Sequence, residues 1–362
     1  MKIKSPLTIL DRYILRKFIG TYIFAIILVL AIVVMFDINE KLDSFLKAPV
    51  HDTVFVYFAN YLPFLANQFA PLFTFIAVIF FTSKLAGNSE IIAMLSTGMS
   101  FRRLLRPYLI GAALIAITSF VMSAYIIPPA NIKRIEYTDR YVKNKRVDYG
   151  ANIMLMAAPN QIAYMSRYDN ISKSGSKFSL ESFDSTKNLT SRLTAQSIKW
   201  DTLYNWRVHD WVIRDFRDGR EFIRRGAVMD TIIPFEPRDF LISANDQEKL
   251  TSPQLREYVE RQRGRGVGNI QSFEVEYHKR FAMTAAAFIL TVIGMALSSR
   301  KVKGGMGVNI GIGLVLSFSY ILFMTVTQSF ALSGLTSPLV AMWIPNIIYM
   351  SIAIFLYMRA SR

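Results

Sequence analysis

Residues that could catalyse a reaction are sparse in this chain and do not form a recognisable site. The three histidines, His51, His209 and His278, lie in separate segments, and no HExxH pair supplies zinc ligands on one helix face. The chain has no cysteine, which excludes a thiolate metal site, a disulfide scaffold and a cysteine nucleophile. It also has no GxSxG elbow and no GxxxxGK[ST] phosphate loop. The sequence therefore predicts a protein that is not an enzyme and binds no metal or cofactor itself. Any energy that it uses must come from a partner.

The composition points to a membrane protein. Of the 362 residues, 52% are hydrophobic and 13% aromatic, and the mean hydropathy is +0.30. These values are too apolar for one water-soluble domain of this length, and they exclude intrinsic disorder. The chain also carries 42 Lys and Arg against 26 Asp and Glu, a net charge of +16. That charge alone is also typical of nucleic-acid binding, so its distribution along the chain has to decide.

Six apolar runs are long enough to cross a bilayer, which needs about 20 residues per helix. A soluble protein with six such core helices would need a far larger polar shell than this chain provides. No Lys or Asp lies in the middle of a run, so we expect no intramembrane proton relay or protease dyad. The runs cover residues 18–36, 53–83 (interrupted by Pro63 and Pro71), 107–130, 281–299, 304–328 and 338–358.

The short loops predict how these helices are oriented. Fourteen Lys and Arg and only two acidic residues lie in the N-terminal segment, the loops after the second and fourth runs, and the C-terminus. The loop 37–52 has two Lys and four acidic residues. Because basic loops stay in the cytoplasm, we expect both termini to be cytoplasmic and the long block 131–278 to lie outside. Three quarters of the net charge is then a topological signal, and the nucleic-acid interpretation loses its support.

The block 131–278 reads as a compact β domain followed by a short helix. Residues 161–165 and 206–208 alternate with period two, and Asp218-Gly219 is a hairpin signal. Ser252 is expected to cap a helix with Pro253 at its first position, and Leu255, Tyr258 and Val259 fall at helical spacing. The glycine-rich segment 264–268 follows no strand and opens no helix, so we interpret it as a linker and not as a phosphate cradle.

The segment 88–98 is the most informative cytoplasmic piece. Asn88 or Ser89 can cap a helix, Glu90 suits its first turn, and Gly98 can end it in the left-handed conformation. Such a short apolar helix between two spans could lie on lipid, or it could insert into a cytoplasmic protein. The residues alone favour neither.

Small and polar residues inside the predicted spans admit two interpretations as well. Gly307 and Gly311 form a small-xxx-small pair that fits either packing within the chain or a subunit interface. The polar residues of the spans are expected to form helix–helix hydrogen bonds rather than to bind substrate. These are Asn60, Asn67, Gln68, Asn309 and Gln328.

In its order of elements the chain resembles the LptF/LptG permeases of the lipopolysaccharide transport ABC exporter. The resemblance runs nearly end to end and includes six spans with an external β domain between the third and fourth. The residues that carry it are 10–15 (LDRYIL), 89–98 (SEIIAMLSTG), 273–280 (FEVEYHKR), the loop 300–307 and 343–346 (WIPN).

The resemblance implies an α-helical membrane protein with six transmembrane helices and an inserted periplasmic β-jellyroll-like domain. The implied domains are 1–130 with transmembrane helices 1–3, 131–278 as the periplasmic domain, and 279–362 with helices 4–6. The segment 88–98 would be the coupling helix, seated in a groove of the ATPase, with Glu90 facing a basic residue there. Its implied coupling residues are Ser89, Glu90, Ile91, Met94, Ser96 and Gly98.

The resemblance also implies partners. They are a second LptF/LptG-type permease, a cytoplasmic ABC ATPase dimer that holds ATP and Mg²⁺, an LptC/LptA-type periplasmic bridge, and lipopolysaccharide taken from the inner membrane. No nucleic acid is expected. Both permease types share this plan, so the resemblance distinguishes neither LptF-type from LptG-type nor a heterodimer from a homodimer, and it does not identify the lipopolysaccharide variant.

The implied cargo is an anionic lipid, so cations near the outer mouth are headgroup candidates. One type of family member has a Lys at the outer end of the first span, where this chain has Met35. The candidates here, which could equally be solvated bases near headgroups, are Lys41, Lys47, Lys133 and Arg134. A different function, a membrane-anchored envelope sensor or assembly scaffold without transport, would have neither an ATPase partner nor lipid extraction.

Overall fold

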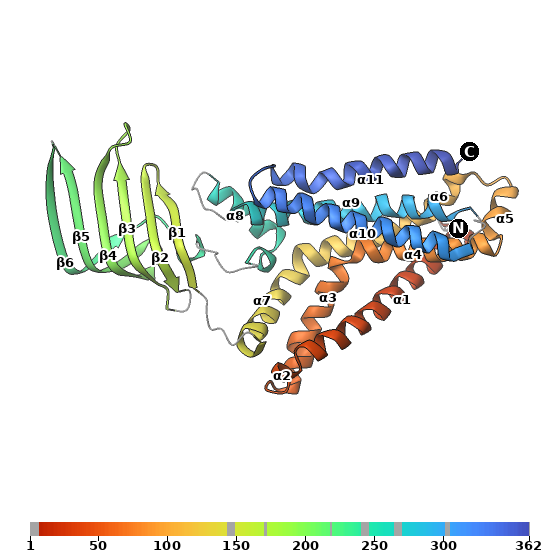
Figure 1. The fold of residues 1–362 in the computed structure, drawn as a ribbon, viewed down its shortest axis with the longest axis horizontal. Helices are drawn as coiled ribbons and strands as arrows, with labels where there is room; N and C mark the ends of the chain where they lie inside the picture. The colour runs from red at the N-terminus through yellow and green to blue at the C-terminus, as the bar shows by residue number, and fades with distance from the viewer. Residues whose placement is uncertain are drawn as a thin grey trace, which may run out of the picture. The chain divides into compact units, whose positions relative to one another are not determined.

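The structure is a computed structural model that describes residues 7–142, 149–169, 172–217, 219–239, 246–263, 270–300 and 305–361. The chain divides into two compact units, one formed by Met1–Asn144 with Val275–Arg362 and the other by Lys145–Glu274. The first unit is helical and the second contains the sheet (Figure 1). Within these described ranges six helices are long and apolar enough to cross a membrane, which confirms the predicted fold class of six spans with an inserted β domain.

The first two spans are built from helices α1, α3 and α4. Helix α1 (Ile9–Glu40) begins with a capping box in which Thr8 and Asp11 bond to each other's backbone amides. After the short α2 (Leu42–Phe45) and the π-helical η1 (Asp52–Phe58), the second apolar run forms α3 (Ala59–Gln68) and α4 (Ala70–Gly87). The break falls beside Pro71, which has no amide hydrogen to continue the ladder. Pro63 stays inside α3, so only one of the two expected interruptions separates helices.

The third span is longer than its apolar run. Helix α5 (Glu90–Ser96) leads into α6 (Phe101–Val121), the π-helical η2 (Met122–Ile126), α7 (Ile127–Tyr137) and η3 (Thr138–Val142). The π-helical turn ends two residues before a Pro-Pro pair at 128–129, where two amide donors are missing. The remaining spans are α9 (Ile270–Ser298), α10 (Gly305–Leu332) and α11 (Pro338–Ala360).

Aromatic stacking joins the first three spans. Phe81 of α4 lies between Phe18 of α1 and Tyr108 of α6, with ring centroids 5.4 Å and 5.1 Å apart. All three rings are buried. Gly111 of α6 is needed here, because a β-carbon at this position would lie 2.4 Å from the Phe18 ring. The close approach of α1 to α6 therefore depends on a missing side chain.

Asn346 joins the last three spans. It is 2% exposed, its Nδ2 donates to the carbonyl oxygen of Ala282 on α9 (2.8 Å), and its Oδ1 accepts from the hydroxyl of Tyr320 on α10 (2.9 Å). One side chain on α11 thus bonds to both neighbouring helices in a place where water cannot substitute.

In the described residues the sheet unit contains one antiparallel six-stranded sheet in which each strand pairs with its neighbours in sequence, consistent with the expected jellyroll-like domain. The strands are β1 (Tyr149–Ala158), β2 (Gln161–Asp169), β3 (Ser174–Phe183), β4 (Leu189–Thr202), β5 (Asn205–Arg217) and β6 (Arg220–Ile232). Trp206 is fully buried in the core with Phe178 and Phe235, and its Nε1 donates to the carbonyl oxygen of Phe235 (3.0 Å). The predicted hairpin lies between β5 and β6, where Gly219 has φ +72°; Asp218 is outside the described residues.

The predicted helix after the sheet is α8 (Ser252–Gln262), which follows the short 3₁₀ turns Pro237–Asp239 and Asp246–Lys249. Leu255, Tyr258 and Val259 are buried as expected. The cap differs from the prediction, because Thr251 and not Ser252 is the N-cap and forms a capping box with Gln254. Thr251 is favoured as the N-cap because Gln254, three residues later, can accept a hydrogen bond from the Thr251 backbone N–H. The glycine-rich segment 264–268 lies outside the described residues.

Candidate functional site

Helix α5 is held by its inward face and exposes apolar side chains on the other. Ile91 is 1% exposed and belongs to the cluster that includes Ile14 of α1 and Leu104 of α6, with Met94 packed against it. Ile92 and Leu95 are 55% and 36% exposed. A helix of seven residues is too short to be stable by itself. Its attachment through Ile91 therefore fixes α5 to the bundle while leaving an apolar edge open.

The ends of α5 agree with the sequence in one respect and differ in another. Gly98 has φ +87°, as expected for a left-handed residue after the helix. Neither Asn88 nor Ser89 provides the side-chain cap that we expected. Ser89 has φ +62° and makes no side-chain cap, because a residue in the left-handed conformation cannot aim its hydroxyl at the following amides. Asn88 bonds to Glu90 instead.

Glu90 accepts hydrogen bonds but has no cation beside it. Its two carboxylate oxygens accept from the Tyr13 hydroxyl (2.9 Å) and from Nδ2 of Asn88 (3.2 Å). No Lys or Arg nitrogen lies within 4 Å of this carboxylate in the part of the chain that the structure describes. The nearby Arg103 is paired with Asp11 through two contacts of 2.7 Å. Among the described residues Glu90 is therefore bonded only to neutral donors.

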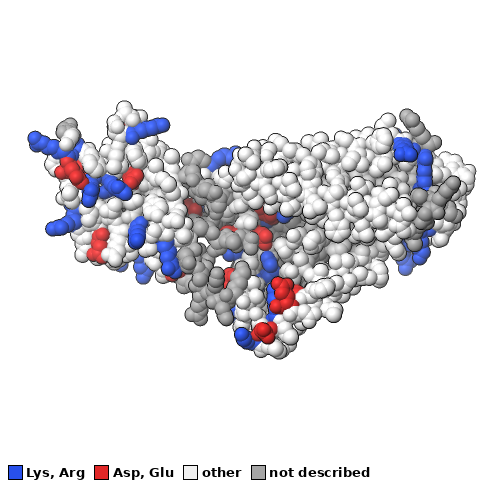
Figure 2. Space-filling model, in the orientation of Figure 1, with Lys and Arg blue, Asp and Glu red and all other residues white. Residues whose placement is uncertain are grey.

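The ion pair of Asp11 and Arg103 is a feature that sequence reasoning missed. The two residues are 92 positions apart, and the Asp11 side chain is 2% exposed. Arg103 also donates to the Thr8 hydroxyl (3.1 Å). The pair links the first turn of α1 to the first turn of α6. Lys and Arg residues form blue areas at the right of Figure 2, which is the end of the helical unit where Figure 1 labels α5 and the C-terminus.

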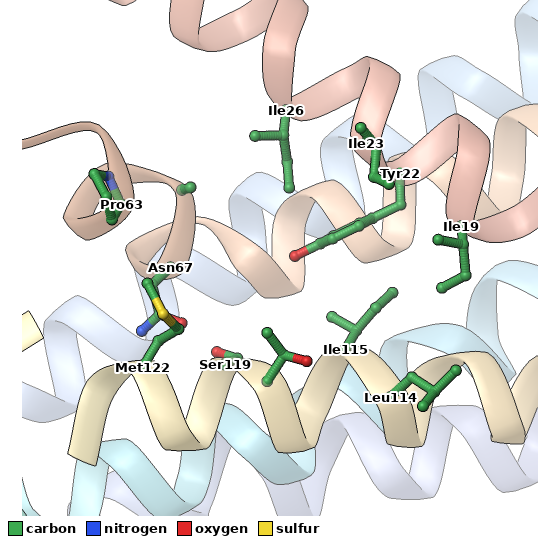
Figure 3. Close-up of a pocket in the computed structure, with 12 residues that line it drawn as sticks. Ile19, Tyr22, Ile23, Ile26, Pro63, Asn67, Leu114, Ile115, Ser119 and Met122 are labelled. Carbon is green, nitrogen blue, oxygen red and sulfur yellow. The ribbon is translucent and has the colours of Figure 1, made fainter. Parts of the chain in front are cut away.

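An apolar cavity of about 390 Å³ lies between α1, α3 and α6. Figure 3 shows the Tyr22 hydroxyl directed into this space, with Asn67 and Ser119 opposite. None of these three side chains has a hydrogen-bond partner among the described residues, so Asn67 does not form the interhelical bond that we expected. The other lining side chains are mainly Ile, Leu, Ala and Pro.

The four predicted headgroup cations differ in their surroundings. Lys41 forms an ion pair with Asp37, which is 5% exposed, and donates to the Tyr57 hydroxyl (2.7 Å). Its charge is therefore already balanced. Arg134 donates to Asn131 (3.0 Å) and lies 4.6 Å from the centre of the Phe64 ring.

Lys47 and Lys133 are the two candidates that remain available. Both are exposed, and neither contacts a carboxylate among the described residues. The structure does not bring the four cations together on one group. Lys41 and Arg134 contact aromatic side chains of η1 and α3, whereas Lys47 and Lys133 are exposed.

The glycines of α10 face two directions. A β-carbon at Gly313 would lie 2.1 Å from Cδ1 of Ile79 on α4, so this residue allows close packing within the chain. At Gly307 and Gly311 no atom lies within 4 Å of the same position. The small-xxx-small pair therefore makes no contact inside the described chain, and its face is open to lipid or to another subunit.

Polar residues of the spans follow the prediction only in part. Asn309 of α10 donates to Ser83 of α4 (3.4 Å), whereas Asn60 donates to Val56 on its own helical segment (2.6 Å). Gln68 and Gln328 form no side-chain hydrogen bond among the described residues. The residue that does connect helices, Asn346, was visible in the sequence only as part of the WIPN segment. No group of three or more His, Asp or Glu side chains suited to a metal ion occurs in the described ranges.

Comparison with known proteins supports one family. The model of the lipopolysaccharide export system permease LptF/LptG matches residues 12–359. A search of individual curated proteins gave no match. The matched range begins in the first turn of α1 and ends in the last turn of α11, so it includes all six spans, α5 and the whole sheet unit.

Proposed function

Because this chain belongs to the LptF/LptG family of lipopolysaccharide export permeases, we propose that it is one permease subunit of an exporter that extracts lipopolysaccharide from the inner membrane. A separate cytoplasmic ATPase supplies the energy, and a periplasmic protein bridge receives the lipid. The observation that carries the proposal is the match over residues 12–359, which includes α5, the sheet unit and nearly the full length of the six candidate spans. The family and the six apolar helices make the chain a multi-pass protein of the inner membrane.

In this proposal α5 is the coupling helix. Its inward face is anchored through Ile91, and its exposed apolar side chains Ile92 and Leu95 can enter a groove of the ATPase. Glu90 pairs with a basic residue of that groove, because no cation in the described chain neutralises it. ATP and Mg²⁺ bind to the ATPase. A push on α5 reaches α1 and α6 through the cluster around Ile91 and through the pair of Asp11 and Arg103.

The membrane unit supplies the path for the lipid. The termini and α5 lie in the cytoplasm, as the basic loops indicate, and the sheet unit lies in the periplasm. The open face of Gly307 and Gly311 on α10 packs against a second permease, since small residues let helices approach closely. The cavity between α1, α3 and α6 accommodates an acyl chain beside this path.

The coupling role can be tested with three variants of the full chain. Glu90→Arg reverses the charge, Glu90→Gln removes it, and Tyr13→Phe removes only the internal hydrogen bond to Glu90. We expect Glu90→Arg to reduce co-purification of the ATPase and lipid export by about tenfold or more, since a like charge would face the basic groove. Glu90→Gln should have a smaller effect, and Tyr13→Phe should leave both close to wild type.

The same preparations test the whole proposal. Wild-type protein should co-purify with a second permease-like chain and two copies of an ATPase, and its vesicles should release lipopolysaccharide when ATP is added. If Glu90→Arg exported lipid normally, the coupling role would be wrong. Absence of both an ATPase partner and lipid release would favour the sensor or scaffold function instead.

A further inference from the structure

A second and smaller cavity lies where α3 meets α4, bounded also by α9 and α10. Its volume is about 80 Å³. Its polar lining residues include the hydroxyl-bearing Tyr320 and Thr325 and three longer side chains from different helices: Gln68 at the end of α3, Lys279 on α9 and Gln328 on α10. All of its lining residues belong to the membrane unit. None of the headgroup candidates expected from the sequence lines it.

Lys279 brings a positive charge to this cavity and has no counter-ion among the residues that the structure describes. Its neighbour Arg280 is buried and paired with Glu276 at 3.0 Å. Lys279 itself contacts no carboxylate and no aromatic ring among the described residues. It is half-buried, and only Arg280 separates it from the uncharged stretch 281–299. A charge at such a position is costly unless an anion accompanies it.

Gln68 and Gln328 add hydrogen-bond donors to the same space. A glutamine amide has two N–H donors, and neither side chain forms a hydrogen bond among the described residues. Polar groups inside a membrane protein are normally bonded to one another or to the backbone. One ammonium and two amides belong to residues that line one cavity, which gives it an excess of donors and suits a ligand made of acceptor oxygens.

The depth of the cavity matches the level of lipid headgroups. Lys84 directly follows the second apolar run and marks the end of that span on the side of α5. Gln68 lies 16 residues before Lys84, which at 1.5 Å per residue is about 24 Å along the helices. The hydrocarbon layer is about 30 Å thick. The cavity is therefore close to the membrane boundary at the end away from α5. Apolar lining residues, among them Leu72, Met283 and Ile321, can contact the adjoining acyl chain.

We propose that this cavity binds a phosphate group of a lipid headgroup, with Lys279 as its counter-ion and Gln68 and Gln328 as hydrogen-bond donors. A phosphate supplies the charge and the acceptor oxygens that these three side chains lack. Assigning the phosphate to the exported lipid rests on the proposed function. A phosphate of an ordinary membrane phospholipid has the same chemistry, so the experiment has to separate the two sources.

The test compares lipid binding to the purified complex in its wild-type form and as Lys279→Gln, Lys279→Arg and Lys199→Gln. Lys199 is an exposed lysine of β4, so its variant has the same change of charge far along the chain from the cavity. The probes are lipopolysaccharide, the same lipopolysaccharide after phosphatase treatment, and phosphatidylglycerol. Retained far-UV circular dichroism and retained partner subunits establish that each variant is folded.

We expect wild type to bind lipopolysaccharide about tenfold more tightly than its dephosphorylated form, because a charge-assisted contact is lost. Lys279→Gln should abolish this preference, whereas Lys279→Arg and Lys199→Gln should keep it. Binding of phosphatidylglycerol that depends on Lys279, without such dependence for lipopolysaccharide, would support a phosphate site that serves a membrane phospholipid and not the cargo.

An unchanged phosphate preference in Lys279→Gln, with no effect on phosphatidylglycerol either, would overturn the site. That result leaves the proposed function intact if the variant still exports lipid. Conversely, a complex that binds phosphatidylglycerol through Lys279 but neither binds nor exports lipopolysaccharide would support the site and contradict the proposed function. The two failures are therefore distinguishable.

Discussion

The hydrogen bond between Tyr320 and Asn346 is expected to stabilise the packing of α10 against α11. Tyr320→Phe removes one hydroxyl and leaves Oδ1 of the buried Asn346 without this donor. Asn346→Leu keeps a similar volume but removes both interhelical bonds. Interhelical hydrogen bonds in membrane proteins contribute about 0.6 kcal/mol on average and up to about 1.7 kcal/mol. We therefore expect Tyr320→Phe to lower the free energy of unfolding by about 1 kcal/mol and Asn346→Leu by about 2 kcal/mol.

The measurement is a double-mutant cycle. Unfolding of the purified protein by SDS in mixed micelles is followed by far-UV circular dichroism for wild type, both single variants and the double variant. The double variant should be more stable than the sum of the single effects predicts, by about 0.6 to 1.7 kcal/mol, because the shared bond is lost only once. Ser351→Ala is the matched control, since this exposed hydroxyl bonds only to Ile347 on its own helix. Additive single effects would refute the reasoning, because they would mean that the Tyr320–Asn346 bond contributes nothing.

Two further predictions concern packing and charge. Gly313→Leu should reduce the yield of folded protein, because its side chain would collide with Ile79. Gly311→Leu should leave folding intact and weaken association with the second permease, which size-exclusion chromatography with light scattering can measure. Equal effects of the two changes would contradict this prediction. Lys41→Gln should destabilise the protein in the same SDS assay, because it leaves the buried Asp37 carboxylate without its ion-pair partner. Adding Asp37→Asn should restore much of the lost stability. If it does not, the Lys41–Asp37 ion pair is not what stabilises the protein.

The six spans could be predicted from sequence because crossing a bilayer requires only that a helix be long enough and apolar enough. Any helix of about 20 uncharged residues satisfies that requirement whatever its neighbours are. The sheet unit was also predictable, since alternating residues and a Gly219 turn are local signals. Details of the helix ends were less secure: Thr251 replaced Ser252 as the cap of α8, and Ser89 capped nothing, because a cap depends on backbone angles that a residue type only favours.

The candidate site was predictable only where it is local. The segment 88–98 could be recognised because a short capped helix with one acidic residue lies within eleven positions. Its anchoring could not, since Ile91 packs against residues from α1 and α6 that are distant in sequence. Likewise, the cations near the outer ends of the spans could be listed from sequence. Their pairing states could not, because Lys41 forms an ion pair with Asp37 and donates a hydrogen bond to Tyr57, whereas Lys47 contacts no carboxylate among the described residues.

The sequence by itself determined that this chain is a six-span membrane protein with an inserted β domain, because apolar length, loop charge and strand periodicity are properties of contiguous residues. Only the tertiary structure decided which polar and small side chains meet. It paired Asp11 with Arg103, turned Gly313 inward and Gly311 outward, and left Lys279 facing a cavity without a counter-ion. The physical reason is that such contacts depend on which faces of the helices pack together. A membrane-spanning helix is apolar on all of its faces, so its sequence does not show which face meets which neighbour.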